Sequence, residues 1–133
     1  MKKIRTLQIA PQKRPKVYYI TPTIEAFRKA VNADGNMHSD IEAKKLEKRV
    51  FALFNQDRFL ADIEANRKID GDIIAGTMYI VATNKNGLPI SLTEEQVSKY
   101  ALRFWKIETF DDIEVAEANL NTLFARFLTD EEV

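Results

Sequence analysis

Cysteine is absent from the chain, and histidine occurs once, as His38. The lack of cysteine excludes disulfide bonds, thiol catalysis and zinc sites that use cysteine ligands. One histidine cannot form a histidine-cluster metal site, and the polar Asn-Met-His-Ser setting of His38 favours an exposed loop side chain over a catalyst or ligand. We therefore expect neither a bound metal ion nor a cofactor.

Glycine and proline are scarce, with four of each among 133 residues. This scarcity argues against long disordered linkers, and the length suits one ordinary domain. The phosphate-binding patterns Gly-x-Gly-x-x-Gly and Walker are both missing. The sequence predicts a single domain over residues 1–133 without a recognisable nucleotide loop.

Long apolar runs are missing as well. The longest, residues 73–82, spans about half of the ~20 residues that a transmembrane helix needs. The N-terminal residues carry charges but no apolar core, which is not typical of a signal peptide. We expect a cytoplasmic protein without membrane association.

Neither sign of charge is in excess, since 20 Lys and Arg balance 20 Asp and Glu. Zero net charge argues against electrostatic capture of nucleic acid. The charge is nevertheless uneven along the chain. Residues 1–16 contain six lysines and arginines and no acid, whereas residues 107–133 contain eight acids and one arginine. We interpret both ends as solvated surfaces; their mutual attraction, within one chain or between subunits, is the alternative.

The uncharged stretch 73–82 predicts a central strand that is buried on both faces, because β-branched and aromatic residues dominate its second half. We expect the rest of the chain to cover one face and a partner subunit to cover the other. The residues that alternate onto one face are Ile74, Gly76, Met78 and Ile80.

The N-terminal half predicts a hairpin followed by a helix. Residues 3–10 alternate loosely and residues 17–20 are rich in β-formers, so both are predicted strands. Thr21 and Pro22 resemble an N-cap and the first position of a helix. The apolar face of that helix is predicted to be Ile24, Phe27 and Val31.

The middle of the chain is less decisive. Residues 39–49 fit either a polar helix or an edge strand, whereas residues 50–54 have the composition of a strand. Residues 59–70 show weak local preference and lead into the central strand.

Two helices are predicted towards the C-terminus. The first opens at Ser91 and Glu94, which fit a capping box, and buries Val97, Tyr100, Ala101 and Phe104. The second spans residues 111–128, with acids in its first turn, where the helix dipole favours them. Those acids are Asp111, Asp112 and Glu114, and its predicted apolar face is Ile113, Ala116, Leu120, Leu123, Phe124 and Phe127.

This order of elements predicts the α+β class: an antiparallel or mixed sheet with helices packed on one face, and a C-terminal helical extension. Alternating strand–helix–strand units, which would indicate a doubly wound sheet, are missing.

Residues 71–81, followed by 91–96, resemble the domain of unknown function 3846 family, in which a Gly-Thr strand precedes a Leu-Thr-Glu-Glu-Gln helix start. Asn66-Arg67 and Phe54-Asn55 resemble two further family features. The resemblance covers about residues 3–104, leaves the final helix outside, and favours strands over residues 40–54. Family members occur in bacteria and phages, often on mobile elements, and the family name implies no activity.

The best polar candidates for a binding site are Asn55, Asn66, Arg67 and Thr77. Two amides and a guanidinium could bind a phosphate or carboxylate. The interpretation we favour is that Asn66 caps a turn and Arg67 pairs with a surface acid. Trp105 lies off the apolar stripe of its helix and is the best candidate for an interface residue.

No residue is singled out as catalytic, so the leading hypothesis is a non-enzymatic accessory protein of a phage or mobile element that binds a host protein. The alternative is a protein that binds a small nucleotide between subunits, near Asn66, Arg67 and Trp105. A third hypothesis is an enzyme with an unrecognised site built from Asp, Arg and Thr. We also expect a homo-oligomer.

Overall fold

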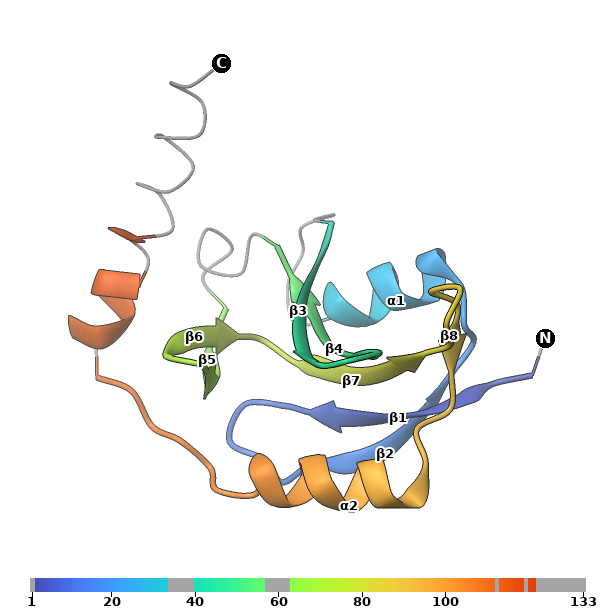
Figure 1. Ribbon diagram of the computed structural model, residues 1–133. Helices are drawn as coiled ribbons and strands as arrows, with labels where there is room; N and C mark the ends of the chain where they lie inside the picture. The colour runs from blue at the N-terminus through green and yellow to red at the C-terminus, as the bar shows by residue number, and fades with distance from the viewer. Residues whose placement is uncertain (1, 34–39, 57–62, 112, 119, 122–133) are drawn as a thin grey trace.

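A computed structural model describes residues 2–33, 40–56, 63–111, 113–118 and 120–121 (Figure 1). Eight strands and two helices are bounded within these ranges, and residues 113–118 and 120–121 are also helical. The elements are β1 (Ile4–Ile9), β2 (Lys16–Ile20), α1 (Ile24–Val31), β3 (Ile41–Glu47), β4 (Val50–Asn55), β5 (Ala65–Ile69), β6 (Asp72–Ala75), β7 (Met78–Thr83), β8 (Pro89–Ile90) and α2 (Glu94–Arg103).

The main sheet is antiparallel and has the order β2-β1-β7-β4-β3, with β8 pairing to β7. β7 is central, since Ile80 lies opposite Leu7 of β1 and Tyr79 lies opposite Leu53 of β4. β5 and β6 form a separate two-stranded ribbon. The α+β class and the predicted β1–β2 hairpin are confirmed.

The stretch predicted as one central strand is two strands, β6 and β7, which belong to different sheets. The chain breaks at Gly76, whose φ of +78° costs glycine little because it has no Cβ. The Gly76 amide still donates to the Glu64 carbonyl at 2.7 Å, next to the Ala65–Ala75 pair, and the chain then passes to the main sheet at Met78. A period-two apolar pattern continues unchanged through such a break, which is why the sequence conceals it.

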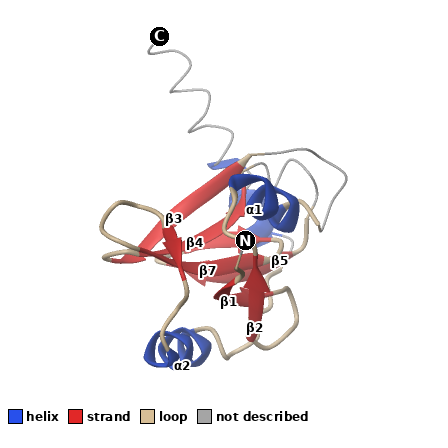
Figure 2. Ribbon diagram, turned by 90° about the vertical axis from the view of Figure 1, so that its right-hand side faces the viewer, coloured by secondary structure: helices blue, strands red, loops and turns tan. Residues whose placement is uncertain are grey.

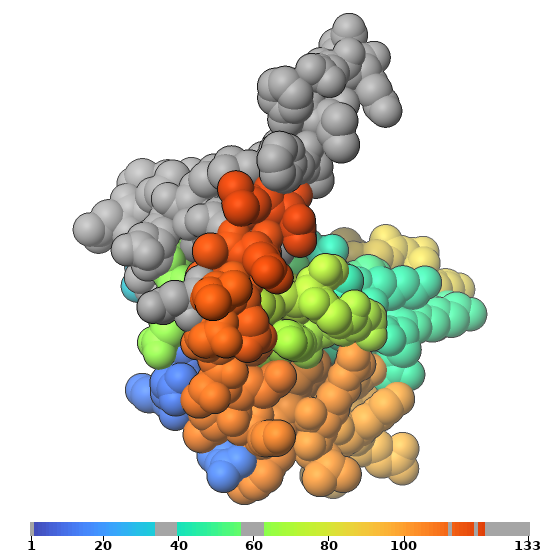
Figure 3. Space-filling view, turned by 90° about the vertical axis from the view of Figure 1, so that its left-hand side faces the viewer, coloured from blue at the N-terminus to red at the C-terminus, as the bar shows by residue number. Residues whose placement is uncertain are grey.

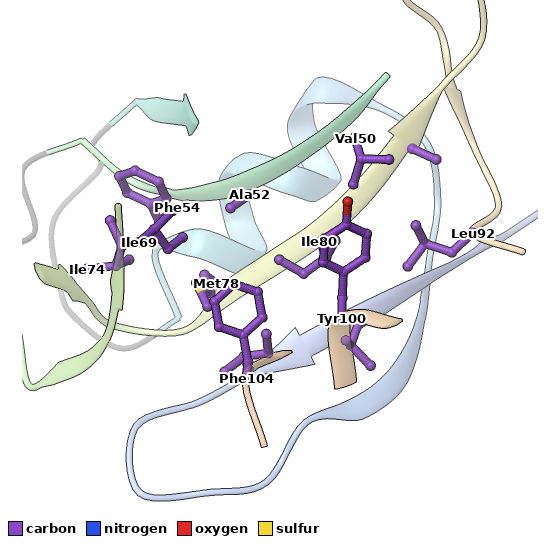
Figure 4. Close-up of a cluster of buried hydrophobic side chains, with 13 residues drawn as sticks. Val50, Ala52, Phe54, Ile69, Ile74, Met78, Ile80, Leu92, Tyr100 and Phe104 are labelled. Atoms are coloured by element: carbon purple, nitrogen blue, oxygen red, sulfur yellow. The ribbon is translucent and has the colours of Figure 1, made fainter. Parts of the chain in front are cut away.

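One helix packs on each face of the main sheet, so the prediction that the helices share one face is wrong (Figure 2). Tyr100 and Phe104 of α2 join the cluster that contains Met78 and Ile80 (Figure 4). Phe27 and Val31 of α1 join Tyr79 and Val81 on the other face. The chain therefore covers both faces of β7 itself, without the expected partner subunit.

Both helices begin two residues later than predicted. Thr23, not Thr21, caps α1, and its hydroxyl accepts from the Ala26 amide at 3.2 Å. Thr93, not Ser91, caps α2 and forms the capping box with Gln96. A Ser or Thr that precedes a periodic pattern is a common cap, and two candidates two residues apart cannot be ranked from sequence.

The buried faces of these helices are nearly those predicted. Tyr100 and Phe104 of α2 are buried, and Val97 and Ala101 pack against the same cluster. On α1, however, Ile24 is 61% exposed. Ile24 is the first residue of the helix and does not belong to the cluster that Phe27 and Val31 join.

Strand β3 confirms the strand interpretation for the described part of residues 39–49. Strand β5 lies within residues 59–70, where the sequence predicted no element. Its burial pattern depends on pairing with β6 and on polar contacts made by Asn66 and Arg67. Residues 106–110 form a connector, and His38 lies outside the described residues.

The C-terminal segment presents a different face from the one predicted. The Asp111 carboxylate accepts from the Glu114 amide at 2.7 Å, as a residue that caps a helix N-terminus does. Phe110 and Ala118 pack against Ile73 and Ala75 of the β5–β6 ribbon, which the segment overlies (Figure 3). The predicted face is exposed at Ile113, Ala116 and Leu120, and Asp112, Leu123, Phe124 and Phe127 lie outside the described residues.

A polar contact joins α2 to β3 at the edge of the core. The Tyr100 hydroxyl donates to the Glu47 carboxylate, and Lys99 Nζ lies 3.1 Å from the same group. The Tyr100 and Lys99 hydrogen bonds hold the pKa of Glu47 below its ordinary value. Burial, followed by the Glu47 contact, raises the pKa of Tyr100.

The first prediction concerns stability in acid. The pKa of Glu47 is lower in the folded protein than in the unfolded chain. The ionised carboxylate therefore stabilises the folded state fully at pH values above the unfolded pKa, and this stabilisation is lost as pH falls through the folded pKa. Glu47→Gln should lower the urea midpoint at neutral pH and flatten the decline on acidification. Urea titrations across this pH range measure both effects, with Glu117→Gln, at an exposed carboxylate, as the control. An unchanged acid decline in Glu47→Gln would contradict the assignment.

Candidate functional site

Asn66 lies on β5 and is fully buried beside the break at Gly76. Its Nδ2 donates to the Ile9 carbonyl at 2.7 Å and to the Gly76 carbonyl at 2.9 Å. The amide thereby connects the end of β1 to the point where the chain leaves the ribbon for β7. Two carbonyls that the broken ladder would leave unpaired are satisfied in this way.

Arg67 is also fully buried, and its guanidinium binds oxygen atoms of the protein itself. Its Nε donates to the Phe104 carbonyl at 3.1 Å, and Nη2 donates to the Lys13 carbonyl at 2.7 Å. Its Nη1 donates to Asn66 Oδ1 at 2.8 Å and, more weakly, to the Asn66 carbonyl at 3.3 Å. The side chain joins the β1–β2 turn, the end of α2 and the ribbon.

Burial is the main influence on the pKa of the Arg67 guanidinium, and it lowers that pKa. The carboxylate of Glu108 opposes this shift and the nearby charge of Arg14 adds to it. The favoured interpretation, in which Arg67 pairs with an acid at the surface, does not describe this geometry. Arg67 lies below the surface, and its direct partners are neutral oxygens.

The structure gathers three of the four polar candidates and separates the fourth. Thr77 is buried and follows Gly76, whose carbonyl Asn66 binds, and Arg67 is the neighbour of Asn66 on β5. Asn55 is buried at the end of β4, where its Nδ2 donates to Asn32 Oδ1 at 3.0 Å beside the end of α1. These residues do not converge on one binding site.

Trp105 lies directly after α2 and is 51% exposed. The guanidinium of Arg14 stacks 4.9 Å from the ring centroid, and its Nη1 donates to the Trp105 carbonyl. Arg67 holds the preceding carbonyl, that of Phe104, from inside. Arg14 thus holds the indole from the outside, while Arg67 holds the backbone of the preceding residue from within.

Other exposed apolar side chains extend from Trp105 along α2 and the edge strand β2. Leu102 is 78% exposed and lies about one turn before Trp105. The Trp105 amide donates to the Leu102 carbonyl. On β2, Tyr19 is 56% exposed and Val17 is also exposed. We call the surface formed by Val17, Tyr19, Leu102 and Trp105 the α2 face.

Two shallow grooves that share Glu94 and Ser98 connect the β2 part of this surface to Leu102. The first, of about 510 Å³, lies between β2 and α2 and is lined by Val17 and Tyr19 on one side and Glu94, Val97 and Ser98 on the other, with Arg5 beneath. The second, of about 480 Å³, shares Glu94 and Ser98 and reaches Leu102. Figure 1 shows α2 running beside β1 and β2.

Sequence reasoning found Trp105 but missed Val17, Tyr19 and Leu102. Leu102 carries a signal, because it lies off the apolar stripe of α2. Val17 and Tyr19 carry none, because β-branched and aromatic residues suit a covered strand as well as an edge strand.

Among the described residues, no group of three or more histidine, aspartate or glutamate side chains is placed to hold a metal ion. Within the same ranges, the helices are too short or too polar to cross a membrane.

The fold and this surface define a small α+β protein with an apolar face beside an edge strand. The sequence profile of the domain of unknown function 3846 family matches residues 4–104, so the chain belongs to that family. The resemblance predicted over residues 3–104 is confirmed, and the match ends at the residue whose carbonyl Arg67 binds. No curated protein and no solved structure matches the chain.

The second prediction is that Arg67 is required for folding. Arg67→Met should lower the free energy of unfolding by about 3 kcal/mol or more, because it leaves the buried acceptors of Lys13, Asn66 and Phe104 without their donor. Urea denaturation followed by circular dichroism measures the loss. Arg14→Ala, which removes an exposed guanidinium, should cost about 1 kcal/mol or less. Equal losses in the two variants would contradict the role given to Arg67.

Proposed function

We propose that this protein is a non-enzymatic accessory protein of a phage or other mobile element that acts in the cytoplasm by binding a host protein. The observation that carries the proposal is the α2 face, where four large apolar side chains are exposed on adjoining elements. The phage or mobile-element setting rests on the family resemblance alone.

The composition of the α2 face supports protein binding. Scattered apolar residues are normal on a surface, but adjoining ones surrounded by polar groups are typical of an interface. Tryptophan and tyrosine supply much of the binding energy in interfaces. Here Trp105 and Tyr19 lie at the two ends of the face, and the charged groups of Arg14, Glu94 and Lys99 lie around it.

The nucleotide alternative has less support. Trp105 could stack a base, but Arg14 already lies over its ring. Asn66 and Arg67, which would bind the phosphate, direct their donors to Ile9, Gly76, Lys13 and Phe104. A native mass spectrum of the purified protein tests this alternative, because a retained small molecule that is lost in Trp105→Ala would support it. The same spectrum reports whether the expected homo-oligomer forms.

The third prediction tests the proposed function by partner capture. Leu102→Asp should reduce the amount of a host protein captured from a bacterial lysate by about tenfold or more, since it replaces the most exposed apolar side chain of the face with a charge. Ile24→Asp is the matched control, because Ile24 is also exposed and apolar but lies on α1, on the opposite side of the sheet. Quantitative mass spectrometry of the captured proteins measures the difference.

Circular dichroism establishes that both variants fold before capture is compared. Capture that is equal for wild type and Leu102→Asp, or that is lost equally in Ile24→Asp, would rule out the α2 face as the binding surface.

A further inference from the structure

Strand β2 is an edge of the main sheet, since β1 is its neighbour on one side and no described strand pairs with the other. Alternate residues of an edge strand direct their N–H and C=O groups away from the sheet, where they can pair with another chain. Lysine, proline or a bulge usually protects such an edge. Here Pro15 and Lys16 stand at its start, and Val17 to Ile20 follow without a charge.

The groove beside β2 is placed to receive side chains of an added strand. Val17 and Tyr19 point into it from β2, and Val97 and Ser98 form its opposite wall on α2. An extended segment that pairs with β2 would turn every second side chain towards this groove. Main-chain hydrogen bonds give affinity in this kind of recognition, and the pockets for alternate side chains give specificity.

The charge around β2 indicates what kind of segment fits. Residues 1–24 contain six lysines and arginines and no acid. Lys13, Arg14 and Lys16 are exposed at the start of β2, whereas Arg5 and Glu94 balance each other along the groove. Positive charge therefore lies at both ends of β2, with Lys13, Arg14 and Lys16 at its start and the exposed Lys2 and Lys3 just before Ile4, which lies opposite Ile20. A second copy of β2 would bring cations to this edge and repel, whereas an acidic segment would be attracted.

We propose that β2 is the docking edge of this protein, and that an extended segment of a partner protein adds to the sheet there, with acidic residues against Lys13, Arg14 and Lys16 and alternate apolar side chains in the β2–α2 groove. The inference rests on the proposed function and adds the mode of binding and the chemistry of the partner.

The fourth prediction uses a synthetic peptide in which alternating valine and threonine precede two acidic residues, so that antiparallel pairing with β2 places the acids at the Lys16 end. This peptide should slow amide hydrogen exchange in β2 of the wild-type protein by about tenfold or more, as measured residue by residue by NMR. A peptide of the same sequence with N-methylated alternate backbone nitrogens keeps the charge and apolar content but removes main-chain donors, and should bind at least about tenfold more weakly. A peptide with lysines in place of the acids should behave likewise.

Lys16→Glu should weaken binding of the acidic peptide by about tenfold, whereas Lys85→Glu should leave it nearly unchanged. Both lysines are exposed and both substitutions change the net charge equally. A difference in peptide affinity between the two variants therefore shows that the peptide binds near Lys16. Equal affinity of the N-methylated and unmodified peptides would overturn strand addition. Protection of β2 that appears on raising the protein concentration without peptide would also overturn it, because it would indicate pairing with a second copy. Protection by a single-stranded oligodeoxynucleotide in place of the peptide would overturn it as well.

Failure of this inference can be told from failure of the proposed function. Capture of a host protein that Leu102→Asp abolishes and Lys16→Glu leaves intact would retain the proposed function and reject docking at β2. Protection of β2 by the acidic peptide, without capture of any host protein, would retain the docking edge and reject the proposed function.

Discussion

The guanidinium of Arg67 is the interaction on which the arrangement of this protein depends. Burial of a charge costs several kcal/mol unless hydrogen bonds replace the lost water. Arg67 obtains these bonds from Lys13, Asn66 and Phe104, which belong to three separate parts of the chain. Since each bond to a charged group contributes about 1.5–3 kcal/mol, the fold is favoured only when all three parts are in place together.

This buried contact also determines the surface. The carbonyls that Arg67 holds belong to residues next to Arg14 and Trp105, which stack on each other outside. The position of the indole, the end of α2 and the turn before β2 are therefore set from within. A surface whose parts are fixed before binding loses less conformational entropy when a partner docks. Arg67, considered above as a ligand-binding group, thus supports one end of the α2 face from within.

Local patterns were sufficient for most of the fold and insufficient for the site. Alternation and composition identified the β1–β2 hairpin, β4 and the stripe of α2, because each reflects contacts made within one element. The break at Gly76 and the strand β5 depend on contacts with residues far away in sequence, such as those from Asn66 to Ile9 and from Arg67 to Phe104. Asn66 and Arg67 were recognised as unusual, yet their burial could not be deduced from residue types that normally lie in water.

The sheet face on which each helix packs is likewise decided by contacts between elements that are distant in sequence. An apolar stripe shows that a helix is covered, but not which face of a sheet covers it. β7 is apolar on both sides, so it accepts α1 on one and α2 on the other. The apolar pattern of β7 indicates that both of its faces are covered, and this is confirmed. The prediction that a partner subunit covers the second face is wrong, because a helix of the same chain packs on each face.

The uncovered edge at β2 belongs to the family core and not to the C-terminal addition. The family match ends at residue 104, whose carbonyl accepts a hydrogen bond from Arg67 Nε. Beyond that point, Phe110 and Ala118 cover Ile73 and Ala75, and Lys68 Nζ lies 3.4 Å from the Glu114 carboxylate. The described part of the addition therefore packs on the ribbon, whereas β2 and α2 keep exposed apolar side chains. Three of the four side chains of the α2 face, those of Val17, Tyr19 and Leu102, lie within the family match, and Trp105 follows its last residue directly.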